Sequence, residues 1–448
     1  MSRQHATQEL EAVFEDESHW LAGLVFLGLG LQVVQILRLI HRFERPPMSP
    51  DAGIFQHIGW VLTRGGQLYV DAWEPKLPLP FETTALLAML SGGDMYLYHV
   101  LNVALMSVAA VGSMALIGLL TYRITSDRVP SLFAGFSPLL LPGFLVRPAY
   151  GFKAKYLLLF FGLLAVYLLL EGHPLASGVS AAASFGYYQL GVIFPLVVVG
   201  LAWQRRGPRT AGKVVAGGAA LTLLSFAPVV LAWNSVSQLV AQALVIPAVV
   251  GGEAPLAKKL LAGGVHFKWA SPFVLVGGYG FLRSVRGELG RKHWWVTACT
   301  VWFGLALFLL DFDVGGYTDL LPGLAFLAIG IGLFADRHSN PEVHRALGGL
   351  MAAVIIVNTV ALGSFGLVFE RVDTREPASM ETLATNERAQ AIETVPDDTP
   401  DVRYLYWNKE TAETCHYRLS LTEVHWLQRA GSDISTDCSD MAEVRRVL

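Results

Sequence analysis

The chain has few charged residues and almost no cysteine. Charged residues make up 15% of its 448 residues, whereas soluble domains average about 25%. Hydrophobic residues reach 53%, and at so low a charge density a soluble protein would expose large apolar patches. Three cysteines exclude a disulfide-built scaffold, and 11% aromatic residues with long apolar runs exclude a disordered chain. These exclusions leave a polytopic membrane protein.

The charge is unevenly distributed along the chain. Residues 1–19 carry one Arg and five acidic residues, and residues 370–448 carry 9 basic and 16 acidic residues. The middle, 20–369, therefore has a net charge of +8, which indicates basic cytoplasmic loops, an anionic ligand, or both. The acidic start is the reverse of a cleavable signal peptide, so we expect Trp20–Ile40 to stay as a membrane anchor.

Apolar runs follow one another along the basic middle of the chain. Beyond the first anchor they cover roughly 79–92, 95–120, 131–146, 156–170, 174–187, 189–203, 212–233, 270–285, 294–310, 320–335 and 346–368. The run 79–92 is too short for a span and predicts an interfacial helix. The stretch 174–203 is too long for one span and is broken at Tyr187-Tyr188-Gln189, so we expect two short helices. About eleven spans result.

The basic loops set the expected orientation. With the N-terminus in the cytoplasm, Arg123 and Arg128 fall inside, and the outer loop 41–96 and the C-terminal tail fall outside. Counting 79–92 as a span and 174–203 as one helix also gives about eleven spans, but it moves Arg123 and Arg128 outside. One feature resists both counts: Arg38, Arg42 and Arg45 cluster at the outer end of the first span. Either the orientation is reversed or these arginines act at the outer surface.

The sequence divides into four expected parts. They are an acidic cytoplasmic tail, 1–19; a transmembrane domain, 20–368; a polar linker, 369–401; and a small extracytoplasmic α/β appendage, 402–448. Val402–Trp407 predicts a strand, and Ser420-Leu-Thr-Glu423 is a capping-box pattern that predicts a helix start. Cys415 and Cys438 either form a disulfide outside the cell or are two free thiols.

The first outer loop predicts an interfacial helix with an acid in its first turn. Ser49 and Pro50 suit an N-cap and a first helical position, and Gly65-Gly66 ends the pattern. The apolar stripe between them consists of Ile54, Phe55, Ile58, Val61 and Leu62. Asp51 then lies at the boundary of water and lipid, either as an acid favoured by the helix dipole or as a catalytic group.

This stretch resembles the GT-C glycosyltransferases that use polyprenyl-phosphate sugars. Their outer loop carries an early Asp, an interfacial helix, Gly before Tyr-x-Asp, and a Lys/His-Pro-Pro-Leu box. The corresponding elements here are Asp51, Gly65-Gly66, Tyr69-Val70-Asp71 and Lys76-Leu77-Pro78-Leu79. A later Tyr before Leu-Pro matches Tyr317 before Leu321-Pro322. Leu77 replaces the usual Pro, and Ala52 follows Asp51 where protein O-mannosyltransferases have Glu. The pattern is most similar to that of archaeal dolichyl-phosphate-mannose mannosyltransferases of N-glycosylation.

The resemblance implies a site and a chemistry. A sugar, mannose by resemblance, would pass from dolichyl phosphate to a lipid-linked or protein-linked glycan on the outer face. Asp51 would be the base that accepts the proton of the attacking hydroxyl, and cations would hold the leaving phosphate. The expected substrate-binding residues are Lys76, Asp71, Tyr69, Arg147, Lys153, Lys155 and Tyr317, with Arg42 and Arg45 as further cations. The alternative for each cation is snorkelling to lipid headgroups.

No cofactor is expected, and a role for a divalent metal stays open. Asp311-Phe-Asp313 has the form of a metal-binding Asp-x-Asp, but it ends a span on the outside, where no nucleotide sugar is supplied. The histidines at 57, 99, 266 and 293 lack metal-ligand spacing. The expected partners are the donor lipid, the glycan acceptor and membrane lipids, with no nucleic acid.

Two other classes of function compete with a transferase. A transporter or flippase is often built from two related halves, and the chain shows no internal repeat. Its candidate functional acid also lies in an outer loop instead of at mid-membrane. A membrane scaffold whose tail binds partners is the third hypothesis. The motifs of the first outer loop favour the glycosyltransferase.

Overall fold

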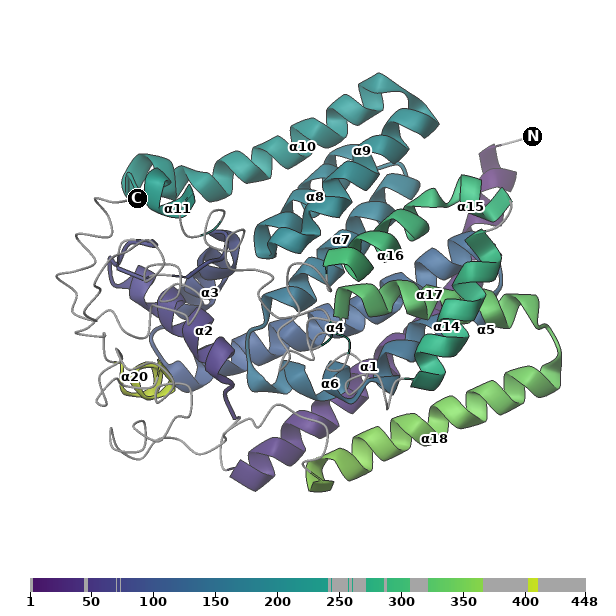
Figure 1. Cartoon of the computed structure of the whole chain (residues 1–448), viewed down its shortest axis with the longest axis horizontal. Helices are drawn as coiled ribbons and strands as arrows, with labels where there is room; N and C mark the ends of the chain where they lie inside the picture. The colour runs from purple at the N-terminus through teal and green to yellow at the C-terminus, as the bar shows by residue number, and fades with distance from the viewer. Residues whose placement is uncertain are drawn as a thin grey trace.

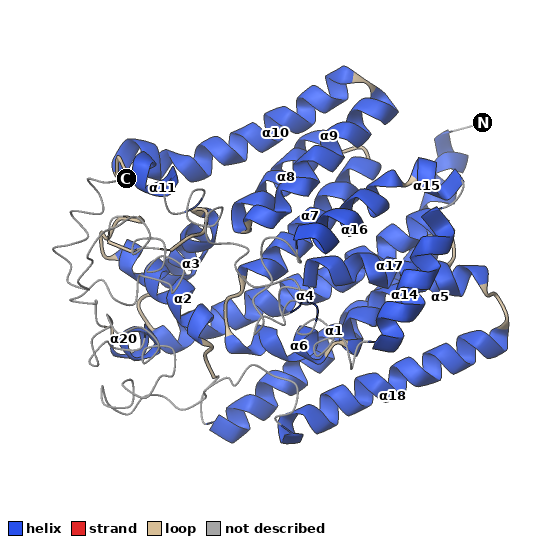
Figure 2. Ribbon diagram, viewed as in Figure 1, coloured by secondary structure: helices blue, strands red, loops and turns tan. Residues whose placement is uncertain are grey.

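The computed structural model describes residues 3–43, 47–69, 71–72, 74–240, 271–285, 288–306, 321–365 and 402–409, with single positions at 243, 257 and 260. These residues are almost entirely helical, and no strand occurs among them (Figure 2). The first half contains α1 (Arg3–Phe43), α2 (Pro50–Thr63), α3 (Leu79–Leu90), α4 (Met95–Thr125), α5 (Arg128–Phe136), η1 (Ser137–Leu140), α6 (Pro142–Val146), η2 (Arg147–Tyr150), α7 (Ala154–Leu170), α8 (Pro174–Tyr187), η3 (Gln189–Val192) and α9 (Ile193–Arg206). The second half contains α10 (Pro208–Ala227), η4 (Pro228–Ala232), α11 (Val236–Val240), α14 (Ser271–Val285), α15 (Glu288–Lys292), α16 (Trp294–Ala306), α17 (Leu321–Arg337), α18 (Pro341–Phe365) and α20 (Val402–Asn408).

Four helical stretches of the described chain are long and apolar enough to cross a bilayer. They are His19–His41, Met95–Thr125, Pro208–Ala232 and Pro341–Val360. Their exposed side chains are largely apolar, as lipid-facing surfaces require. A bent helix pair makes a fifth candidate. The mostly helical membrane fold is therefore confirmed, whereas the expected count of about eleven spans stays a prediction.

Of the two expectations about short helices, the division of 174–203 is confirmed. The run 79–92 forms the 12-residue helix α3, which is too short to cross a bilayer alone, and its interfacial position stays a prediction. The stretch 174–203 forms two helices, α8 and α9, because Tyr188 adopts an extended conformation (φ −158°, ψ 133°) that ends α8. The break leaves Tyr188 and Gln189 where they contact the first outer loop.

The apolar run 131–146 differs from a continuous helix. The chain leaves the helical conformation at Leu141 (φ −99°, ψ 112°), just before Pro142. Proline lacks a backbone donor and disfavours a helical residue before it. The helical segments on the two sides of this break, Arg128–Leu140 and Gly143–Tyr150, meet at 83°. This bend brings η2, and with it Arg147, to the end of the bundle that carries α2.

The predicted strand at Val402–Trp407 is wrong, because these residues form the helix α20. Their aromatic residues favour strands only weakly, and tertiary packing overrides such a preference. Arg403 and Tyr406, one helical turn apart, are both buried. The capping box at Ser420 and both tail cysteines lie outside the described residues, so the disulfide stays a prediction.

The arginine cluster at the end of the first span acquires one structural role. Arg38 donates hydrogen bonds to the carbonyl oxygens of Thr359 (2.8 Å) and Val360 (3.0 Å) in α18. Gln35 donates to the same Thr359 oxygen at 3.0 Å. Arg38 therefore joins α1 to α18. The side chains of Arg42 and Arg45 lie outside the described part.

The two ends of the bundle carry different elements. Figure 1 shows α2, α3 and α20 together at one end, on the left, with the N-terminus at the opposite end. The long α4 begins beside α2 and runs into the bundle (Figure 1). The candidate catalytic loop and the described tail segment therefore lie at the same end.

Candidate active site

The helix that carries Asp51 forms as its sequence predicts. The Ser49 hydroxyl accepts a hydrogen bond from the Ala52 amide at 3.2 Å, and Pro50 occupies the first helical turn. The helix stops at Thr63, and Gly65 follows with φ 91°. Asp51 therefore sits in the first turn of α2, with 44% of its side chain exposed.

Two cations from beyond the bend face the Asp51 carboxylate. Lys153 forms an ion pair and a hydrogen bond with Asp51 Oδ2. An Nη atom of Arg147 lies 3.6 Å from the same oxygen. The side chains of Lys153 and Arg147 are only 12% and 7% exposed. Both cations were expected from the sequence, and the structure brings them together with Asp51.

A glycine with a special backbone conformation places Lys153. Gly151 has φ 96° and ψ −161°, a region almost restricted to glycine. A Cβ atom here would lie 2.6 Å from Gln56 Oε1, so only glycine fits. The next amide, that of Phe152, donates to Gln56 Oε1 at 3.3 Å. The α2 helix thus fixes the backbone immediately before Lys153.

Two further cations share one aromatic ring. The ammonium groups of Lys155 and Lys76 lie 4.6 Å and 5.2 Å from the centre of the Tyr188 ring. Such contacts are attractive because the face of the ring is electronegative. Lys76 also lies 3.8 Å from Glu74. Tyr188 and Glu74 were not predicted as site residues. The helix break at Tyr188 is the sequence signal that could have identified Tyr188.

Tyr69 and Asp71, expected to bind substrate, make bonds inside their own loop. The Tyr69 hydroxyl donates to the carbonyl oxygen of Lys76 at 2.6 Å, and Tyr69 itself is fully buried with φ 67°. Asp71 Oδ2 accepts from the Gln67 amide at 2.8 Å. Gln189 donates to the Pro75 carbonyl oxygen at 3.0 Å. These bonds shape the loop that presents Lys76.

The neighbouring cations change the acidity of the carboxyl groups. Lys153 holds the pKa of Asp51 far below its ordinary value; burial opposes this effect, and Arg147 and Lys76 add to it. Burial raises the pKa of Glu74, and nearby Lys76 counteracts part of that rise. Asp51 is therefore a firmly ionised carboxylate inside a cluster of cations.

The remaining candidates divide into described and undescribed residues. Tyr317, Asp311 and Asp313 lie outside the described part of the chain. Among the residues that the structure describes, no group of three His, Cys, Asp or Glu side chains is placed to hold a metal. His99 lies 3.2 Å from Gln56 Oε1 and 3.3 Å from the Pro47 carbonyl oxygen, so hydrogen bonding within the fold accounts for its position.

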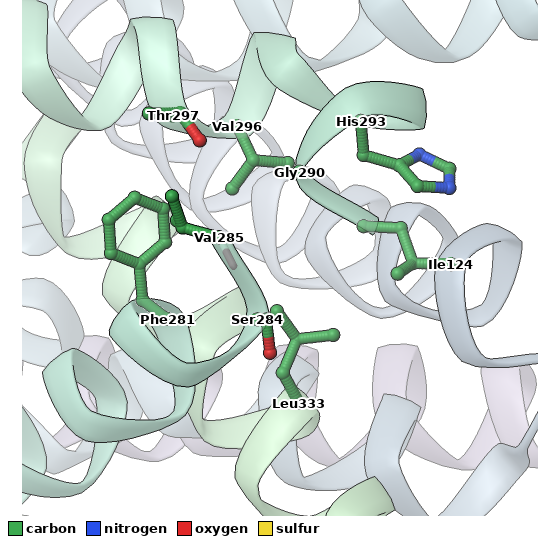
Figure 3. A pocket seen from close by; sticks show the side chains of 9 residues that line it. All are labelled: Ile124, Phe281, Ser284, Val285, Gly290, His293, Val296, Thr297 and Leu333. Atoms are coloured by element: carbon green, nitrogen blue, oxygen red, sulfur yellow. The ribbon is translucent and has the colours of Figure 1, made fainter. Parts of the chain in front are cut away.

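A small pocket lies away from the charged residues around Asp51. It is lined by Phe281 and Ser284 of α14 and by Thr297 of α16, which face one another (Figure 3). Ile124, which also lines it, belongs to the last turn of α4. Met106, which accepts a hydrogen bond from the Lys153 amide through its sulfur, is about 27 Å away along the same helix. No Lys, Arg, Asp or Glu side chain lines the pocket. It therefore lacks the charges that phosphate transfer requires.

The sequence comparisons agree with the resemblance seen in the first outer loop. A family model described as DolP-mannose mannosyltransferase matches residues 65–227. A dolichol phosphate-mannose mannosyltransferase of Haloferax volcanii is 28% identical over 419 residues, which cover 88% of this chain and 91% of that protein. The region matched by the family model includes Lys76, Arg147, Lys153 and Lys155.

Solved structures identify the fold. ArnT from Cupriavidus metallidurans, solved with undecaprenyl phosphate bound, superimposes with a TM-score of 0.58 at 14% identity, covering 95% of this chain and 91% of ArnT. The archaeal oligosaccharyltransferase AglB from Archaeoglobus fulgidus, in complex with an inhibitory peptide and a dolichol-phosphate, gives 0.53 at 12% identity. That match covers 82% of this chain and 58% of AglB. The chain therefore has the GT-C glycosyltransferase fold and is similar in sequence to the dolichyl-phosphate-mannose mannosyltransferases, as its first outer loop predicted.

Proposed function

We propose that this protein is a membrane mannosyltransferase that moves mannose from dolichyl phosphate to a glycan acceptor in protein N-glycosylation. The observation that carries the proposal is the charge arrangement around Asp51. One carboxylate faces Lys153 and Arg147, and Lys76 and Lys155 gather on Tyr188 nearby. A firmly ionised acid that faces several cations suits the displacement of a sugar from a phosphate, because one proton has to be accepted and one anion held.

The reaction assigns a task to each kind of group. The acceptor hydroxyl oxygen forms a bond to the anomeric carbon of mannose and gives its proton to Asp51. The bond between that carbon and the phosphate oxygen breaks, and its electron pair remains on the phosphate. Dolichyl phosphate leaves with one more negative charge than it had in the donor. The cations at Lys76, Arg147, Lys153 and Lys155 stabilise that developing charge.

The ion pair with Lys153 implies that donor binding activates the base. A carboxylate with a strongly lowered pKa is a poor proton acceptor. A phosphate that binds Lys153 and Arg147 competes with Asp51 for them. The pKa of Asp51 then rises towards its ordinary value as the donor occupies the site. Proton transfer therefore becomes favourable only once the donor is present.

The proposed site faces the extracytoplasmic side. The helix α2, which carries Asp51, and the tail segment α20 lie at the same end of the bundle, opposite the N-terminus (Figure 1). The basic residues Arg205 and Arg206 lie in the last turn of α9, and Arg209 lies at the start of α10. Positive loops favour the cytoplasm. A cysteine introduced as Ser379→Cys should react with a membrane-impermeant maleimide in intact cells. Labelling only after lysis contradicts this orientation.

The proposed activity is tested with the full-length protein in liposomes. Dolichyl phosphate mannose is supplied together with an acceptor from a strain that lacks this protein. The acceptor is either the lipid-linked glycan or the protein-linked glycan of that strain. Extension of either acceptor by one mannose supports the proposal and identifies the acceptor. Movement of the intact donor across the bilayer with no sugar transfer supports the rival flippase instead.

A further inference from the structure

The C-terminal helix α20 packs on the end of the bundle that carries Asp51. Tyr406 is fully buried, and Leu405 is 2% exposed. The Tyr406 hydroxyl donates to the carbonyl oxygen of Met95, in the first turn of α4, at 2.7 Å. Its ring lies 5.6 Å from that of Tyr98. These contacts fix a segment distant in sequence against α4, and Tyr406 also packs with Ala52 and Trp60 of α2.

The residues of α4 that touch α20 also hold the Asp51 helix. Tyr98 donates through its hydroxyl to the carbonyl oxygen of Gln56 at 2.7 Å. His99 lies edge-on to the Trp407 ring, with ring centres 5.8 Å apart. The Nδ1 atom of His99 lies 3.2 Å from Gln56 Oε1. Two neighbouring residues of α4 therefore connect α20 to a single residue of α2.

Gln56 connects this contact to the proposed active site. Its side-chain oxygen accepts from the Phe152 amide, and Phe152 directly precedes Lys153. Gln56 and Asp51 share α2, and Lys153 pairs with Asp51. A displacement of Gln56 would therefore move the backbone before Lys153 relative to the Asp51 carboxylate. Gly151 would transmit such a shift, because the space that a Cβ atom would take there is already occupied by Gln56, His99 and Ala52.

We propose that residues 402–408 are a positioning element for the Lys153–Asp51 pair and act through His99 and Gln56. The inference rests on the function proposed above. It makes this segment of the tail part of the support of the active site. Loss of the contacts made by residues 402–408 should loosen the Lys153–Asp51 pair without removing any group from the active site.

The acidity of Asp51 supplies a readout that simple destabilisation does not move. The charged groups that act on Asp51 are Lys153, Arg147 and Lys76, and Asp51 in turn acts on Glu74. Lys153 has the largest effect on Asp51. If Lys153 moves away, the pKa of Asp51 rises, and the enzyme loses activity at a higher pH as the solution is acidified. A variant that only unfolds more easily loses active protein but keeps the same pH profile.

The experiment compares full-length Trp407→Ala and Tyr406→Phe with the wild type in the mannosyl-transfer assay. Trp407→Ala should lower kcat/KM by about tenfold, since small misplacements of catalytic groups are costly, and shift the acidic limb to higher pH. Tyr406→Phe keeps the ring but loses the bond to Met95, so a smaller change in the same direction is expected. Lys409→Asn, at an exposed position just after α20, is the matched control and should behave as the wild type.

A double variant tests the route. If Trp407 acts through His99, then Trp407→Ala should add little to the loss caused by His99→Ala, because coupled residues are not additive. An acidic limb that stays at the wild-type pH in Trp407→Ala, or fully additive losses in the double variant, would overturn the inference. A wild type with no transferase activity would instead refute the proposed function.

Discussion

The carboxylate of Asp51 and the ammonium group of Lys153 form an ion pair although 102 residues separate them in the chain. Asp51 lies in the first turn of α2, and Lys153 immediately precedes α7. Two elements on opposite sides of α4 in the sequence thus meet at one charged contact. The pair holds Asp51 in its ionised form, and under the proposed function it also holds a cation close to the leaving phosphate.

Asp51→Asn should reduce mannosyl transfer strongly. Asparagine keeps the size of the side chain but cannot accept the proton, and loss of a general base costs about 10²- to 10⁴-fold in rate. The measurement is glycan extension per amount of folded protein, with folding checked by a melting curve. Asp71→Asn is the control, because Asp71 bonds to its own loop and the asparagine oxygen still accepts that bond. Loss of extension in Asp71→Asn alone would exchange the roles of the two acids.

Lys153→Met should alter the pH dependence of the reaction. Lys153 is the main cause of the lowered pKa of Asp51, so without it that pKa rises towards its ordinary value of 3.8. Activity requires the ionised carboxylate. The variant should therefore lose kcat/KM on acidification at a higher pH than the wild type does. The loss of one charged hydrogen bond should also raise the KM for the donor by about one to two decades. An unchanged acidic limb would contradict the assigned role of the pair.

Donor binding by Lys76 and Lys155 should depend on the Tyr188 ring that both lysines contact. Tyr188→Phe keeps the ring face and should retain most activity, whereas Tyr188→Leu removes both cation–π contacts, each worth about 0.5–2 kcal/mol. We expect about a tenfold rise in the KM for the donor in Tyr188→Leu. Lys76→Ala should lose one to two decades of activity at limiting donor, and Lys76→Arg should lose less. Wild-type turnover in Lys76→Ala would exclude it as a phosphate ligand.

Gly151→Ala should destabilise the protein more than an equivalent change elsewhere. Gly207 has a similar backbone conformation, φ 78° and ψ −177°, but no atom lies within 4 Å of the Cβ position there. Gly207→Ala should therefore show only the backbone cost, about 1–3 kcal/mol. In Gly151→Ala the clash with Gln56 adds to that cost, and the displaced Lys153 should also lower activity. Melting curves of both variants measure the difference. Equal melting temperatures would show that the site tolerates the extra atom.

Glu82→Gln should stabilise the protein at alkaline but not at acidic pH. Burial raises the pKa of Glu82 to about 7, and a hydrogen bond with Ser225 opposes part of that rise. A carboxyl group with a raised folded-state pKa destabilises the fold once it ionises. Wild-type stability should therefore fall as the pH rises from about 4.5 through about 7. Glu82→Gln removes this dependence, so its melting temperature should exceed the wild-type value near pH 8 and match it near pH 5 (both about one to two units from the folded pKa). A constant difference at both pH values would contradict the assignment.

The sequence alone determined the elements whose causes are local. Ser49 and Pro50 start α2, Gly65 follows its end, and the break at Tyr188 divides 174–203. Capping bonds and glycine conformations involve residues a few positions apart, so a linear pattern contains them. The motif from Asp51 to Leu79 likewise carries the resemblance to the GT-C glycosyltransferases, and that resemblance predicted sugar transfer from a polyprenyl phosphate.

Tertiary structure alone decided which of these residues meet. The sequence offered Lys153 as one of several outer cations, but only the folded structure sets it beside Asp51. It also shows that Tyr69 and Asp71 are bonded within their own loop. The aromatic residues of the segment 402–408 favoured a strand, but the segment is a helix whose Tyr406 packs against α2 and α4. Such contacts join positions that are tens to hundreds of residues apart. Their energies depend on the folded arrangement of the whole bundle, and no local pattern of residues contains them.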